Sequence, residues 1–172
     1  MTPSANGRSN GSSSLPTFHV EVSPKFGSAD APGQSLLGQI PLLGIAGCRE
    51  VRVSSLYEIS GRLTSAQVHQ LSRDLLSDPV TQEYRIDSSA TSPAFLLGPH
   101  WRIEVWLKPS VTDPAGESVR KAVTDLGLPA PEGVRTGAAY RLLGRMNQAQ
   151  VERIAVKLLA NPVIHRARVT QL

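Results

Sequence analysis

Residues 101–116 read WRIEVWLKPSVTDPAG, and a related stretch, FHVEVSPKFGSADAPG, occupies residues 18–33. The offset of 83 positions holds without a gap, so that residues 18–87 align with residues 101–170 at about twenty identical positions. Self-similarity at a fixed offset is the signature of a structural repeat. The sequence therefore predicts two copies of one small folding unit on a single chain.

The alignment divides the chain into four segments. The first unit spans residues 17–87, and the second spans residues 101–172. Residues 88–100 are rich in Ser, Thr, Pro and Gly and are the predicted linker. Residues 1–16 are expected to be a disordered leader, because they are rich in Ser, Asn and Gly and lack the apolar core of a secretory signal.

Each unit is predicted to begin with a strand and a helix. In the second unit, alternating apolar residues over Trp101–Leu107 indicate a strand with one buried face. Asp113 supplies a side-chain acceptor for free backbone N–H groups, and Pro114 suits the first helical position. A helix with an apolar stripe over Val119–Leu126 should follow, and Gly127 should end it.

The second part of the unit is predicted to hold a hairpin, a helix and a strand. Val134–Thr136 and Ala139–Leu143 read as two strands that turn at Gly137, a residue tolerant of positive φ. The stretch Asn147–Gln150 resembles a capping box that opens an amphipathic helix. The last strand is predicted at Val163–Val169.

The order strand, helix, strand, strand, helix, strand is that of the ferredoxin-like fold, in which both helices cover one face of an antiparallel sheet. The predicted fold class is therefore α+β, with two ferredoxin-like (βαββαβ) repeats. A unit of about 70 residues has a small core of its own. The two units are thus expected to form a pseudo-twofold pair, either through their open sheet faces or through their sheet edges.

Three motifs of the second unit carry a family resemblance. They are KPSVTDPAG at residues 108–116, VRTG at residues 134–137 and LLANPVI at residues 158–164. Together they resemble the PurS family, the small subunit of phosphoribosylformylglycinamidine synthase, and the resemblance covers residues 101–170 well. The repeat is then a tandem duplication of a PurS-like unit.

Both units depart from the family pattern in places. The first unit resembles the family only through its kinship to the second, and it is the degenerate copy. Ala31 and Asp78 stand where the second unit has Pro114 and Asn161. The second unit has Ala138 where family members usually carry a lysine after the hairpin glycine.

The resemblance implies a non-catalytic role within an ATP-dependent amidoligase. In the family, a pair of small subunits bridges a PurL-type synthetase subunit and a PurQ-type glutaminase subunit. The glutaminase releases ammonia from glutamine. The synthetase uses ATP and Mg to activate the amide oxygen of formylglycinamide ribonucleotide, and ammonia then displaces phosphate to give the amidine. No cofactor and no catalytic residue are expected in this chain.

The motifs that carry the resemblance also supply the candidate partner interface. Its residues are Lys108, Asp113, Pro114, Gly116, Arg135, Gly137, Asn161 and Pro162. Asp113 is expected to cap a helix in addition.

Composition narrows the remaining possibilities. No apolar stretch approaches the roughly 20 residues that cross a bilayer. Cys48 is the only cysteine, which favours the cytoplasm. The four histidines lie far apart without the spacing of a metal site, so no metal is expected. No nucleic acid is expected as a partner, and a homo-oligomer is possible beyond the intramolecular pair.

The net charge of +4 is distributed unevenly along the chain. Residues 1–100 carry seven basic and eight acidic residues, whereas residues 101–172 carry eleven and six. Two interpretations of the arginines in the second unit stay open, a surface for an acidic partner or an ordinary solvated face. These arginines are Arg135, Arg141, Arg145, Arg153, Arg166 and Arg168.

Two other functions share the predicted fold, and the fold alone does not separate them. The first unit has Asp30-Ala31-Pro32-Gly33, which resembles the D-x-P-G turn of ACT-type modules that bind amino acids. The basic second unit also suits an RRM-like RNA-binding module. The sequence lacks the aromatic strand motif of such modules, because Tyr140 is the only aromatic residue in residues 134–142.

Overall fold

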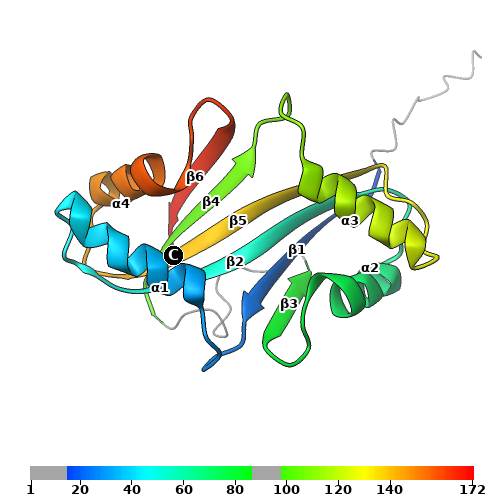
Figure 1. Ribbon diagram of the computed structural model, residues 1–172, viewed down its shortest axis with the longest axis horizontal. Coiled ribbons are helices and arrows are strands. Elements are labelled where there is room, and N and C mark those ends of the chain that lie inside the picture. The colour runs from blue at the N-terminus through cyan, green and yellow to red at the C-terminus, as the bar shows by residue number, and fades with distance from the viewer. Residues whose placement is uncertain (1–14, 87–97) are drawn as a thin grey trace, which may run out of the picture.

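The computed structural model describes residues 15–86 and 98–172 (Figure 1). The predicted leader up to residue 14 and the predicted linker from residue 88 to residue 97 lie outside the described residues. Within the described part of the chain, no helix is both long and apolar enough to cross a bilayer.

Both repeats have the same series of elements, with one long central strand in each. The first repeat contains β1 (Thr17–Pro24), α1 (Ala31–Gln39), the short 3₁₀ helix η1 (Ile40–Leu43), β2 (Cys48–Ser60), α2 (Ser65–Leu71), the π-helical turn η2 (Ser72–Leu76) and β3 (Gln82–Ile86). The second repeat contains β4 (Trp101–Leu107), α3 (Pro114–Asp125), β5 (Gly133–Gly144), α4 (Gln148–Ile154), the π-helical turn η3 (Ala155–Leu159) and β6 (His165–Gln171).

The six strands form one antiparallel sheet in the order β3-β1-β2-β5-β4-β6. The helices cover one face of this sheet, with α1 and α4 over one half and α2 and α3 over the other (Figure 1). The α+β class is therefore confirmed. Of the two expected ways of pairing, the structure has the edge-to-edge one, because β2 and β5 pair along almost their whole length.

The predicted hairpin at Gly137 is wrong, because β5 runs straight through this residue from Gly133 to Gly144. Gly137 is not one of the glycines with positive φ. A Cβ at Gly137 would lie 2.7 Å from ring atoms of Trp106 on the neighbouring strand. The glycine is needed for the packing of Trp106 across the sheet, and not for a turn.

Because the central strands run straight, each hydrophobic core takes side chains from both repeats. One core combines Leu36 and Ile40 of the first repeat with Ile103, Val151 and Ile154 of the second. The other core is built mainly from the first repeat, and the second repeat adds Val123 and Val134 to it. The helices α1 and α3 therefore pack in the half of the molecule that contains the sheet edge of the other repeat.

Each half is a ferredoxin-like unit assembled from two repeats. In the half with α2 and α3, the strands follow the order β3, β1, the end of β2 and the start of β5. This is the strand order 4-1-3-2 of the split βαβ arrangement, with the first helix and second strand supplied by the other repeat. The predicted ferredoxin-like repeats are thus present, but their segments are exchanged between the copies.

The pseudo-twofold axis can be located from the strand register. The offset of 83 makes Ser55 and Ala138 equivalent positions, and these two residues are direct partners in the pairing of β2 with β5. The axis therefore passes between Ser55 and Ala138, at the centre of the sheet.

The predicted helix ends are confirmed, with two local corrections. Capping boxes begin α2 at Thr64 and α4 at Asn147. Leu126, predicted to lie in the apolar stripe of α3, is 42% exposed, because it follows the last turn of that helix. The last strand begins two residues later than predicted, because the backbone N–H groups of Ile164 and His165 both bond to the carbonyl of Asn161 in a turn.

Candidate partner interface

Asp113 ties the start of α3 to the long strand β5. Its Oδ1 accepts a hydrogen bond from the backbone N–H of Gly116 at 2.8 Å, which caps the helix. Its Oδ2 accepts a second hydrogen bond from the backbone N–H of Thr136 at 2.6 Å, and the hydroxyl of Thr136 donates to the same carboxylate. Asp113 is therefore a structural residue, and both of its oxygens are occupied.

Gly116 allows the helix to approach that strand closely. A Cβ at this position would overlap the carbonyl oxygen of Val134. Pro114 precedes it in the first turn of α3, where the missing N–H group of proline is harmless. Gly116 therefore sets the spacing of helix and strand, whereas Pro114 is exposed.

Lys108, Asn161 and Pro162 come together at the end of β4. The Lys108 ammonium donates a hydrogen bond to the carbonyl of Pro162 at 2.6 Å. The side chain of Asn161 accepts a hydrogen bond from the backbone N–H of Val163 at 2.9 Å, which shapes the turn before β6. The two loops at this corner of the second repeat are thus held together by side-chain contacts.

Arg135 and Gly137 lie on the opposite, helix-free face of the sheet. The guanidinium of Arg135 donates to the carbonyl of Leu107 at 2.9 Å and to Glu58 Oε1 at 3.3 Å. It also lies 5.9 Å from the ring centroid of Trp106, which packs across Gly137. The predicted residues therefore occupy both faces of the sheet around the end of β4, and do not form a single flat patch.

The same contacts recur in the first repeat. Lys25 donates to the carbonyl of Pro79 at 2.6 Å, and Arg52 donates to the carbonyl of Pro24 at 2.8 Å. Asp30 caps α1 through Gly33 and accepts from the backbone N–H of Val53 at 2.8 Å. Recurrence at both corners identifies these contacts as structural in both repeats. A role of the predicted residues in binding a partner stays a prediction.

The two alternative functions gain no support from this geometry. Asp30 is 5% exposed, and its two oxygens accept hydrogen bonds from Gly33 and Val53, so the carboxylate of the ACT-like turn is not open to a ligand. An RNA-binding sheet needs exposed aromatic rings on its open face. Tyr140 packs against the core on the helix-covered face, and Trp106 is covered in part by Arg135.

The sequence did not reveal a buried ion cluster that joins the repeats on the helix-free face. Glu21 of β1 is 2% exposed and accepts hydrogen bonds from both terminal nitrogens of Arg141, which is fully buried. Arg102 donates to Glu21 at 3.1 Å and to Glu104 at 2.7 Å. The hydroxyl of Ser54 accepts a further bond from Arg141 at 3.2 Å. The cluster thus links strands from the two repeats across the middle of the sheet.

The charges in this cluster alter one another's pKa values. Burial alone would raise the pKa of Glu21, but the hydrogen bond from Arg141 and the charges of Arg141 and Arg102 hold it below its usual value. Burial lowers the pKa of Arg141 despite its bond to Glu21. Burial also opposes the charge of Arg102, but the charges of Glu21 and Glu104 and the hydrogen bonds to them together outweigh burial and raise the pKa of Arg102. Glu21 is therefore ionised throughout the neutral range.

Glu21 is expected to make the stability of the protein fall in acid. Its pKa is lower in the folded chain than the ordinary glutamate value of about 4.3 in an unfolded chain. Its stabilising contribution is complete above that ordinary value and is lost as the pH falls through the lower, folded value. Urea denaturation of the wild-type chain and of Glu21→Gln between pH 7 and pH 3 tests this. The free energy of unfolding should fall less steeply in the variant, and parallel pH profiles would contradict the assignment.

The positions that the pseudo-twofold axis relates to this cluster carry different charged side chains. The offset of 83 relates Glu21 to Glu104, Arg102 to His19 and Arg141 to Glu58. The second position thus contains two carboxylates and one histidine in place of one carboxylate and two guanidinium groups. His19 lies 3.9 Å from Glu58, and Glu58 also contacts Arg135. The symmetry of the backbone is therefore broken by the side chains.

A cavity of about 370 Å³ adjoins the cluster on the helix-free face. Leu56 and Trp106 provide its apolar walls, and Glu21, Arg102 and Glu104 provide its charged ones. The charged groups pair with one another, so this cavity presents no strong excess of either charge. Among the residues that the structure describes, no group of His, Cys, Asp and Glu is arranged to hold a metal ion.

Comparison with known proteins gives two matches to one family model, over residues 17–90 and residues 100–171. The model is described as PurS, phosphoribosylformylglycinamidine (FGAM) synthase. No curated protein matches the chain.

Solved structures give matches of the same kind. PurS of Methanocaldococcus jannaschii, described as one of the subunits of formylglycinamide ribonucleotide amidotransferase in the purine biosynthetic pathway, is 28% identical, with 44% of this chain and 96% of that chain covered and a TM-score of 0.40. PurS of B. subtilis is 29% identical, with 44% and 99% covered and a TM-score of 0.40. PurS of Thermus thermophilus is 28% identical, with 44% and 99% covered and a TM-score of 0.34.

Proposed function

The chain belongs to the PurS family of FGAM synthase subunits, and from this premise we propose that it is the structural subunit that holds the synthetase and the glutaminase of that enzyme together. It is a component of a ligase complex in purine biosynthesis. In this proposal the chain contributes surfaces and no reacting group. The cytoplasm, favoured by the lone Cys48, is the compartment we assign to it.

The observation that carries the proposal is the union of two family units in one sheet. The family model matches twice on one chain, and β2 and β5 join the matched segments about an axis between Ser55 and Ala138. One tandem chain therefore contains the same two units as a symmetric pair of single-unit chains. We propose that one such chain takes the place of two single-copy subunits in the complex.

The broken symmetry of the side chains supports a bridge between two different partners. The equivalent positions at Glu21 and Glu104 differ at the surface as well as in charge, because the His19 side chain is 58% accessible and its equivalent Arg102 is 10% accessible. A symmetric pair presents the same surface twice, whereas two unlike partners need two unlike surfaces. The tandem chain can vary its two copies independently, which a homodimer cannot do.

The reaction assigned to the complex takes place on the partners. The glutaminase releases ammonia from glutamine, and the synthetase uses ATP and Mg to activate the amide oxygen of formylglycinamide ribonucleotide. Ammonia then replaces phosphate to give the amidine. The tandem chain keeps the two active sites in one assembly, so it matters most when the ammonia comes from glutamine.

Reconstitution from purified subunits tests this function. Glutamine-dependent turnover by the synthetase and glutaminase of the same organism should need the tandem chain, whereas turnover with added ammonium should survive in its absence. Native mass spectrometry of the complex should find one tandem chain for each synthetase.

Two outcomes would contradict the proposal. Equal glutamine-dependent turnover with and without the tandem chain would show that it bridges nothing. Two tandem chains for each synthetase would rule out the replacement of two single-copy subunits by one chain. Turnover with added ammonium serves as the control, because it reports whether the synthetase itself is active.

A further inference from the structure

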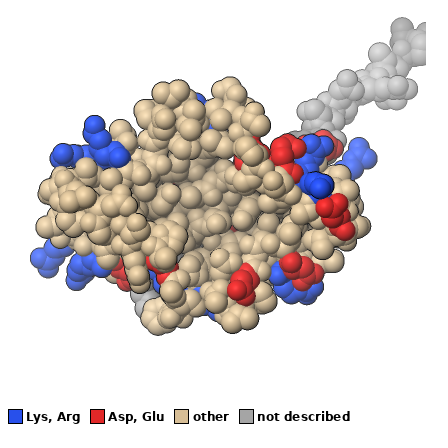
Figure 2. All heavy atoms as spheres, viewed as in Figure 1, with Lys and Arg blue, Asp and Glu red and all other residues tan. Residues whose placement is uncertain are grey.

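Exposed positive charge gathers at one end of the molecule. Figure 2 shows mostly Lys and Arg at the end that carries α1 and α4, with some Asp or Glu beside the lower group of them, and a mixture of both signs at the opposite end. We call the first end the basic end. Its exposed cations are Arg49, Arg145, Arg153, Lys157, Arg166 and Arg168.

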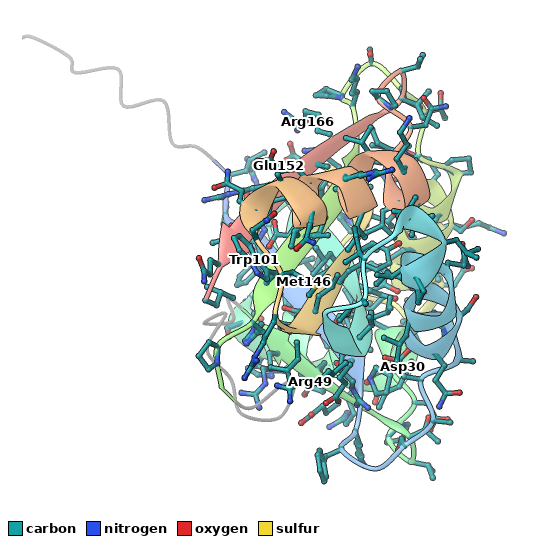
Figure 3. All side chains as sticks on the ribbon, turned by 90° about the vertical axis from the view of Figure 1, so that its left-hand side faces the viewer. Asp30, Arg49, Trp101, Met146, Glu152 and Arg166 are labelled. Atoms are coloured by element: carbon teal, nitrogen blue, oxygen red, sulfur yellow. The ribbon has the colours of Figure 1, made fainter. Side chains whose placement is uncertain are left out.

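Arg49 and Arg145 of this end come together through the exchange of segments between the repeats. Arg49 belongs to the first repeat, but the start of β2 lies beside the end of β5, where Cys48 pairs with Gly144. The backbone N–H of Arg145 donates to the carbonyl of Gly47 at 2.8 Å, which places the two loops against each other. Figure 3 views this end directly, with Arg166 and Glu152 in its upper part and Arg49 in its lower part.

The basic end has little negative charge to balance it. Glu152 is its one exposed carboxylate among the described residues, and its Oε1 accepts a hydrogen bond from Gln148 at 2.8 Å. Glu50, next to Arg49, is half-buried. None of the six cations forms an ion pair within residues 15–86 and 98–172. The positive charge of this end is therefore available to a partner.

The opposite end is different. Among the described residues, its exposed charged side chains comprise four cations and five carboxylates, and two of the cations are already paired, Arg73 with Asp74 and Arg120 with Glu117. The exposed groups of this end are Arg62, Arg73, Arg120, Lys121, Asp74, Asp78, Glu117, Asp125 and Glu132. The exposed charges of the described residues are thus unequal between the two ends, and such an imbalance orients an approaching charged surface.

A small hollow marks the most distinctive part of the basic end. It has a volume of about 290 Å³ and is lined by Ala46, Gly47, Arg49 and Arg145. Two guanidinium groups beside one hollow suit a carboxylate, because arginine pairs with carboxylates through parallel hydrogen bonds. The six exposed cations, against one exposed carboxylate among the described residues of this end, extend this preference to the surrounding surface.

We propose that the basic end is the docking surface for an acidic patch on a partner subunit, with a carboxylate of the partner held between Arg49 and Arg145. The inference rests on the proposed bridging function and adds which end of the chain meets the acidic partner. A protein surface is favoured over single-stranded nucleic acid, because the residues that line the hollow include no aromatic ring, and base stacking needs such rings.

Charge reversal at the two ends tests the proposal. The full-length variant Arg49→Glu/Arg145→Glu removes the positive hollow, and Arg62→Glu/Lys121→Glu is the matched control at the opposite end. All four side chains are exposed. Binding to the purified synthetase and to the purified glutaminase is measured by surface plasmon resonance at several salt concentrations. The basic-end variant should associate about tenfold more slowly with one of the two subunits and lose most of the salt dependence.

The milder variant Arg49→Gln/Arg145→Gln controls for a folding defect. It should associate at a rate between those of the wild type and the charge-reversal variant, and its melting temperature should be unchanged. Equal slowing by the basic-end and control variants, or no slowing by either, would overturn the inference while leaving the proposed function intact. The inference would also be overturned if the basic-end variant lost binding to a single-stranded RNA while its binding to both subunits stayed unchanged. If the wild-type chain binds neither subunit, the proposed function fails first and the inference fails with it.

Discussion

Replacing Arg141 with methionine should lower the free energy of unfolding by about 3–5 kcal/mol, because it removes the main partner of a buried carboxylate. Arg141 is fully buried, and both of its terminal nitrogens donate to Glu21, which is 2% exposed. Methionine fills a similar volume but donates no hydrogen bond. Urea denaturation at pH 7 measures the loss.

Two further variants separate this cost from a general effect of substitution. Arg153→Met on the exposed face of α4 should stay within about 0.5 kcal/mol of the wild type. Glu21→Gln combined with Arg141→Met should recover a large part of the loss, because no buried carboxylate is then left without Arg141. A single variant Arg141→Met that unfolds at the wild-type urea concentration would contradict the buried cluster.

Gly33→Ala should destabilise the protein by about 2–4 kcal/mol, through overpacking and a distorted helix cap. A Cβ at Gly33 would lie 2.5 Å from the carbonyl oxygen of Val51 and 2.7 Å from Asp30 Oδ2. The sheet holds the first atom in place, and the hydrogen bond to Val53 holds the second. Thermal unfolding gives the size of the effect.

The same helix offers a matched control for Gly33→Ala. Gly38 is exposed and has nothing within 4 Å of an added Cβ, so Gly38→Ala should stabilise the protein by about 0.5–1 kcal/mol. Hydrogen exchange adds a test of the exchanged segments. Because α1 shares a core with α4, Gly33→Ala should weaken protection in α4 of the second repeat. Protection lost only in the first repeat would contradict the shared core.

Much of the fold could be predicted from local chemistry. Helix caps such as Asp113 and Thr64 depend on residues within a few positions of one another, and the structure confirms them. The repeat itself is visible because equivalent residues recur at one offset. The order of the elements and the ferredoxin-like class follow from these two kinds of signal.

The hairpin could not be predicted correctly, because a glycine has more than one use in a strand. Gly137 suits a turn, but it also suits the close packing of a neighbouring ring, and here it serves Trp106. The first repeat indicates that the turn is wrong, because Ser54 occupies the position equivalent to Gly137, and serine adopts positive φ less readily than glycine. Once the strand is straight, the exchange of helices between the halves follows.

The buried cluster could not be predicted from the sequence either. Glu21 alternates with Val20 and Val22, as a solvent-facing residue of a strand does. Its main partner, Arg141, is 120 residues away and reaches it only through the pairing of β2 with β5. The candidate interface residues were found by family resemblance, and the structure adds that their polar atoms also hold the loops of each repeat together.

The straight central strands determine how the protein responds to dilution. If the two repeats were separate molecules, each half would lose a helix and part of its sheet on dissociation, and stability would depend on concentration. On one chain the missing segments are always present, at an effective concentration that the connection sets and that is of millimolar order for short flexible linkers. A single molecule can therefore complete both cores by itself, however rare it is in the cell.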